Sequence, residues 1–71
     1  MTKTISQIRN KANALIREYR EEVNDYGLEG AGDEYLHRLN KYIGEFWDYE
    51  FQDRRQIQAV IDDLKRAISN P

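Results

Sequence analysis

Apolar residues recur every three or four positions along most of the chain. In the first third they lie at Ile5, Ile8, Ala12, Leu15, Tyr19, Val23 and Tyr26. This spacing keeps one apolar stripe on a helix of 3.6 residues per turn, whereas a half-buried strand needs a period of two. Two further stripes follow, at Leu36, Leu39, Ile43 and Phe46, and at Ile57, Val60, Leu64 and Ala67. The sequence therefore predicts an all-α protein built from three amphipathic helices.

The ends of the first helix carry capping residues. Thr4 and Gln7 have the spacing of a capping box, in which each side chain accepts a hydrogen bond from the other residue's backbone N–H. Gly27 suits the left-handed conformation that ends many helices, and Leu28 is placed to close a Schellman contact onto Val23. Together these signals define both ends of the first predicted helix.

Asp33 and Asp53 are the expected N-caps of the other two helices, because a short acidic side chain accepts hydrogen bonds from the first free backbone N–H groups. Three of the four glycines fall between Gly27 and Gly32, so a short loop joins the first two helices as a hairpin. We expect one domain, residues 1–71, folded as a small antiparallel three-helix bundle. It consists of a helical hairpin plus a third helix, with helices over 4–26, 33–50 and 53–69.

The break between the second and third helices is the open point of this prediction. Gly44 is expected inside the second helix, at a cost of about 0.5–1 kcal/mol relative to alanine, and neither Gly nor Pro follows it before Pro71. One heptad register runs from 36 to 67 with only Glu50 and Asp53 polar, so one continuous helix is the alternative. Two polar seam positions weaken a long helix, and we therefore favour the turn.

The small size of the chain limits its core. A protein of 71 residues buries only about 60% of the surface that its unfolded form exposes. The absence of cysteine excludes disulfides and Cys-based zinc sites. Self-association, as a homo-oligomer and most simply a dimer, is therefore expected to supply further burial.

Charge and hydropathy narrow the class of partner. The net charge of −2 argues against general nucleic-acid binding. No apolar stretch exceeds three residues, so neither a secretory signal nor a membrane span is predicted. We expect a cytoplasmic protein, and its small size and composition would suit an accessory protein of a phage.

Residues 42–51 contain five of the eight aromatic residues. If the apolar stripe of this helix faces inward, Trp47 and Tyr49 cannot both be covered by two thin neighbouring helices. One interpretation is an aromatic core that seals the elbow between the second and third helices. The other is a protein interface, because Tyr and Trp dominate binding hot spots. The residues of that predicted interface are Tyr42, Trp47, Tyr49 and Phe51.

Acidic residues gather at the end of the first helix, whereas residues 1–17 carry bases and no acid. Glu18, Glu22 and Asp25 belong to this acidic group. The simplest interpretation is a solvated surface. The functional one is complementarity toward a basic partner, or head-to-tail pairing with the basic end of another copy.

Neither a catalytic group nor a cofactor site is predicted. Ser6 and Ser69 lie at opposite ends of the chain from each other, so His37 has no nucleophile to activate. Glu34 and His37 have the spacing of half a di-iron ligand set, but we interpret them as solvated side chains at a helix start. A metal-carrying dimer is the third hypothesis for function.

Two basic pairs on the third helix could contact phosphates: Arg54 and Arg55, and Lys65 and Arg66. Neighbouring acids explain them as ordinary ion pairs. A nucleic-acid-associated helical dimer is therefore the second hypothesis. The first is a non-enzymatic protein–protein interaction module, a small regulator or inhibitor that docks on a larger protein through the aromatic and acidic residues.

Overall fold

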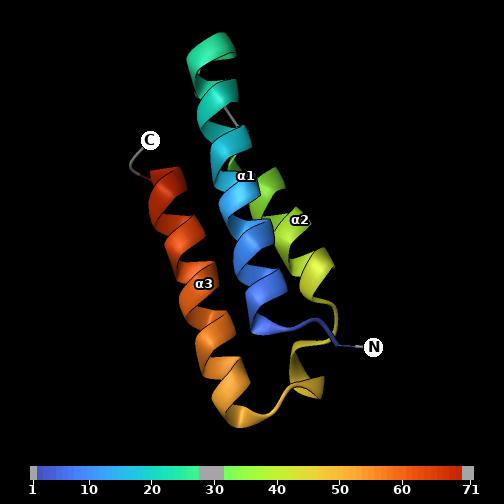
Figure 1. Ribbon diagram of the computed structural model, residues 1–71. Helices are drawn as coiled ribbons and strands as arrows, with labels where there is room; N and C mark the ends of the chain where they lie inside the picture. Colours follow the sequence, from blue (N-terminus) through green and yellow to red (C-terminus); the bar gives the residue numbers. More distant parts are fainter. Residues whose placement is uncertain (1, 28–31, 70–71) are drawn as a thin grey trace.

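The computed structural model of the chain describes residues 2–27 and 32–69. Its helices are α1 (Ile5–Tyr26), α2 (Gly32–Ile43) and α3 (Phe51–Ser69), with a short 3-10 helix, η1 (Phe46–Asp48), between α2 and α3. In Figure 1, α1 and α3 run in the same direction and α2 runs in the opposite one. The predicted all-α three-helix bundle, with its α1–α2 hairpin and third helix, is confirmed.

The apolar stripes of the three helices meet in one core. Ile8, Leu15 and Tyr19 of α1 are almost completely covered, as are Leu39 of α2 and Ile57 of α3. Among the described residues, no polar or charged residue is buried. In residues 2–27 and 32–69 the buried hydrophobic residues are Ile8, Ala12, Leu15, Tyr19, Tyr35, Leu39, Ile43, Tyr49, Ile57, Val60, Ile61 and Leu64.

α1 begins and ends as its capping residues predict. The Thr4 hydroxyl accepts a hydrogen bond from the Gln7 backbone N–H at 3.1 Å, and the Gln7 side chain accepts one from the Thr4 N–H at 2.9 Å. Gly27 has a φ of 89°, and its N–H donates to the Val23 carbonyl at 3.0 Å. The predicted Leu28 contact lies outside the described residues.

The break after α2 is real, but it comes earlier than predicted. α2 ends at Ile43, so the expected helix over 33–50 and the alternative of one continuous helix are both wrong. The cause is Gly44, which has a φ of 80° and stands at the end of the helix instead of in its interior. Its N–H donates to the Asn40 carbonyl at 3.1 Å. In this left-handed region a side chain costs roughly 1–2 kcal/mol, which a glycine avoids.

The two aspartates proposed as N-caps lie inside their helices instead, Asp33 as the second residue of α2 and Asp53 as the third residue of α3. α2 begins at Gly32 and α3 at Phe51, so Asp33 and Asp53 each occupy a first turn. In α3 the first turn is closed by the Arg54 N–H, which donates to the Glu50 carbonyl at 2.8 Å. The aspartates still favour helix formation, because negative charge near a helix N-terminus is stabilised by the helix dipole.

Tyr49 holds the segment between α2 and α3, called the elbow below, which comprises residues 44–50. Its ring is buried, with 7% of the residue exposed. Its hydroxyl donates to the Ile43 carbonyl at 3.0 Å and accepts from the Lys3 backbone N–H at 2.9 Å. One phenol therefore joins the end of α2, the elbow and the segment before α1. No helix among the described residues is long and apolar enough to cross a membrane.

We predict that Tyr49→Phe lowers the free energy of unfolding by about 1–2 kcal/mol, because each lost hydrogen bond contributes about 1 kcal/mol. Urea unfolding followed by circular dichroism measures the change. Tyr26→Phe is the matched control, since Tyr26 is 86% exposed, and it should leave the midpoint unchanged. Equal midpoints for the two variants would show that the Tyr49 hydroxyl does not stabilise the elbow.

Candidate protein interface

The elbow exposes large aromatic side chains to solvent. Trp47 of η1 is 77% exposed, and Phe51 at the start of α3 is 66% exposed. Phe46 is partly buried against the core and meets Trp47 edge to face, with ring centroids 5.5 Å apart. Exposed rings of this size, held next to each other, are typical of protein contact surfaces.

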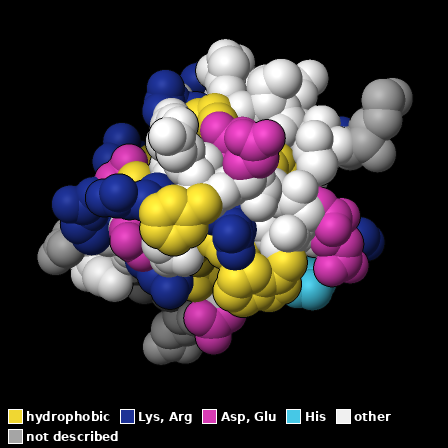
Figure 2. Space-filling model, turned by 90° about the horizontal axis from the view of Figure 1, so that it is seen from below, with side chains coloured by type: hydrophobic (Ala, Val, Ile, Leu, Met, Phe, Trp, Pro, Cys, Tyr) yellow, Lys and Arg dark blue, Asp and Glu magenta, His cyan; other side chains and the backbone are white. Residues whose placement is uncertain are grey.

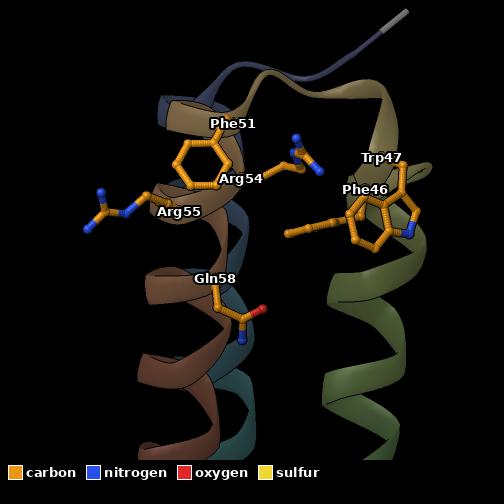
Figure 3. Close-up of a pocket in the computed structure, with 6 residues that line it drawn as sticks. All are labelled: Phe46, Trp47, Phe51, Arg54, Arg55 and Gln58. Carbon is orange, nitrogen blue, oxygen red and sulfur yellow. The ribbon is translucent and has the colours of Figure 1, made fainter.

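These rings line a groove of about 260 Å³ on the side of the molecule where α2 and α3 face each other. In Figure 3, Phe46 and Trp47 lie on one side, Phe51 lies across from them, and Arg54 points between them. The volume is below the roughly 300–1,000 Å³ of small-molecule sites, and it suits a side chain from another protein. We call this the aromatic groove, lined by Phe46, Trp47, Phe51, Arg54, Arg55 and Gln58.

Arg54 is held in the groove by stacking. Its guanidinium carbon lies 5.1 Å from the centre of the Trp47 ring and 5.8 Å from that of Phe51. Both distances are within the range of cation–π attraction. Its Nε is buried without a hydrogen-bond partner, and within the described part of the chain its guanidinium forms no ion pair. The positive charge of Arg54 is therefore not neutralised by a carboxylate of the groove.

Figure 2 views the molecule from the elbow end, where hydrophobic side chains reach the surface in separate groups with Lys and Arg beside and between them. Tyr42, which was predicted to join this surface, is partly buried instead. Lys3 Nζ and Lys11 Nζ lie 4.8 Å and 5.6 Å from the centre of its ring. Tyr49 is in the core. Of the four predicted aromatic contact residues, only Trp47 and Phe51 line the groove.

The predicted acidic residues lie at the opposite end of the bundle. Glu18 contacts Arg38 at 3.6 Å, Glu22 accepts a hydrogen bond from the Tyr35 hydroxyl at 2.5 Å, and Asp25 is exposed. α1 runs away from the elbow, so its C-terminal turns are far from the aromatic groove (Figure 1). The structure does not bring the acidic and aromatic residues together on one surface.

The basic residues of the nucleic-acid hypothesis are also divided. Arg54 and Arg55 line the aromatic groove, whereas Lys65 and Arg66 lie near the other end of α3. Arg66 forms an ion pair with Asp63 in the preceding turn. A second hollow of about 510 Å³ has only polar residues among its described lining, Gln52, Arg55 and Gln56.

Glu34 and His37 are both exposed on α2, and Glu34 forms an ion pair with Arg38 at 2.8 Å. Within residues 2–27 and 32–69, no three His, Asp or Glu side chains gather closely enough to hold a metal ion. Comparisons with protein-family models, curated proteins and solved structures find no match to this chain.

Four lining residues of the groove were not predicted as contact residues. Phe46 was assigned to the apolar stripe, Arg54 and Arg55 to phosphate contacts, and Gln58 to no role. The available signal was the spacing of Phe51, Arg54, Arg55 and Gln58, which places them on one face of a helix. The missing information was the path of the elbow, which puts Phe46 and Trp47 across from that face.

Tyr35 links α2 to α1 and gives the bundle a dependence on high pH. Its hydrogen bond to Glu22, together with burial, raises its pKa from 10.0 to about 12. The raised pKa means that the folded state holds the phenolic proton more tightly than the unfolded state does. The stabilisation is therefore fully present below about pH 10 and is lost as the pH rises toward 12.

We predict that the difference in unfolding free energy between wild type and Tyr35→Phe shrinks between about pH 9 and pH 11.5. Parallel urea titrations of the two proteins at several pH values measure it, and other tyrosines cancel in the difference. A difference that stays constant over this range would exclude the raised pKa of Tyr35.

Proposed function

We propose that this chain is a non-enzymatic protein–protein interaction module, a small regulator or inhibitor that docks on a larger protein through the aromatic groove. The observation that carries the proposal is the pair of exposed rings, Trp47 and Phe51, on either side of Arg54, which pairs with no carboxylate in the described part of the chain. Trp and Arg are enriched among hot-spot residues, and a contact that covers them removes a large apolar area from water.

The location of the groove supports a protein as the partner. Within the described residues the bundle keeps twelve hydrophobic residues buried, yet Trp47 in the elbow and Phe51 at the start of α3 are left at the surface. Their exposure costs roughly 25 cal/mol for each Å² of apolar surface, which docking would recover. The acidic residues that were expected to form a rim are at the far end, so the proposed contact is centred on the groove alone.

We predict that Trp47→Ala weakens binding to the larger partner at least about thirtyfold while the chain stays folded. Loss of a hot spot costs at least about 2 kcal/mol, or roughly thirtyfold in affinity. The partner is first captured from the source cells on immobilised wild-type chain, and the affinity of the purified pair is then measured by calorimetry. Unfolding free energy should change by no more than about 0.5 kcal/mol, as for other exposed positions.

Tyr26→Ala is the control, because it removes an equally exposed ring at the other end of the molecule. It should bind the captured partner like wild type. Salt adds a second readout, since contacts with several phosphates weaken steeply between about 50 and 200 mM salt whereas an aromatic contact does not. Equal loss in the two variants, or a steep salt dependence, would rule out docking through the aromatic groove.

A further inference from the structure

The C-terminal end of α1 extends beyond the rest of the bundle. The Tyr19 hydroxyl donates to the carbonyl of Ile68, one residue before the end of α3. α1 continues for seven more residues, to Tyr26, which is about 10 Å of helix. Figure 1 shows these turns projecting past both α2 and α3. Val23 still packs against the core and Glu22 contacts Tyr35, so the part of this projection open to contact is the outer face that carries Glu21, Asp25 and Tyr26.

The chemistry of this projection is distinctive. Its surface combines an aromatic ring, Tyr26, that is 86% exposed with three acidic residues and no basic residue after Arg20. Among the described residues, neither Glu21 nor Asp25 forms an ion pair. We call this surface the acidic tip, formed by Glu21, Glu22, Asp25 and Tyr26.

The acidic tip and the aromatic groove are complementary. The groove offers apolar walls with two arginines, and none of its lining residues is acidic. The tip offers one aromatic side chain surrounded by carboxylates. Opposite charges around an apolar contact raise both the rate and the specificity of association. The molecule is 38 Å long and carries the two surfaces at opposite ends, so the tip cannot reach the groove of its own chain.

We propose that the aromatic groove accepts the acidic tip of a second copy of this chain, with Tyr26 against Trp47 and Phe51 and Asp25 facing Arg55. Each copy then places its acidic tip in the groove of one neighbour and receives the tip of another neighbour in its own groove. Such a heterologous contact does not close on itself as a two-fold dimer does; it continues into a ring or an open chain of molecules. The proposal rests on the groove of the proposed function, and self-association would compete with the larger partner for it.

The test is sedimentation velocity of the purified chain over about 10–500 µM, a range suited to small contact areas. Wild type should increase in average mass with concentration. Trp47→Ala lacks an intact aromatic groove and Tyr26→Ala lacks an intact acidic tip, so each should remain monomeric. An equimolar mixture should form a 1:1 pair and nothing larger, because each variant retains the surface that the other has lost.

Trp47 is the only tryptophan of the chain, so its fluorescence follows the groove directly. Its emission should shift to shorter wavelength as wild type is concentrated, and it should not shift in Tyr26→Ala. Asp25→Lys and Arg55→Glu test the same contact with exposed residues if an alanine variant fails to fold. Each alone should be monomeric, whereas their mixture should associate, because both charge pairs are then opposite again. Asp63→Lys, an exposed acid that pairs with Arg66 outside both surfaces, is the control and should behave like wild type.

Two results would overturn the proposal. If wild type is monomeric over the whole range, the groove does not accept the tip. If Tyr26→Ala associates like wild type while Trp47→Ala does not, two grooves meet each other and the occupant is wrong. Neither result affects the proposed function, which is judged by the affinity for the larger partner. If wild type self-associates as predicted but Trp47→Ala binds the larger partner as tightly as wild type does, only the proposed function is excluded.

Discussion

The architecture depends on how the chain turns at the elbow. Gly44 takes a backbone conformation that other residues adopt at a cost, and α2 therefore ends at Ile43. Tyr49 then fixes the turn from within, through one hydrogen bond to the end of α2 and one from the segment before α1. Because the elbow is held on the inside by Tyr49, Trp47 and Phe51 face outward. The same turn that completes the core also creates the aromatic groove.

The core was largely predictable, since it follows from helical periodicity. The apolar stripe of the first helix gave Ile8, Leu15 and Tyr19 as core positions, and all three are almost completely covered. Thr4 and Gln7 form their capping box because the interaction is local, within one turn of helix. Local patterns of this kind are complete in the sequence and need no knowledge of the rest of the fold.

The elbow was less predictable, because a heptad register carries no information on backbone conformation. Apolar spacing alone runs through Gly44 without interruption, and a positive φ is permitted by glycine but not required by it. Which aromatic residue would be buried also depended on the turn. Helix geometry predicts that Trp47 and Tyr49 cannot both be covered, and the path of the elbow decides that Tyr49 is the buried one. The separation of Glu22 and Asp25 from the groove likewise follows from the direction of α1.

The projection of α1 has a consequence for its internal dynamics. Up to Val23 the helix is supported by core contacts, whereas Asp25 and Tyr26 are exposed, and Asp25 places negative charge where the helix dipole disfavours it. Free energies of local opening therefore fall along this one helix, and its last backbone amides exchange their hydrogens faster than those in the middle. A ligand that binds this end also suppresses that local opening, and part of its binding free energy is spent on doing so.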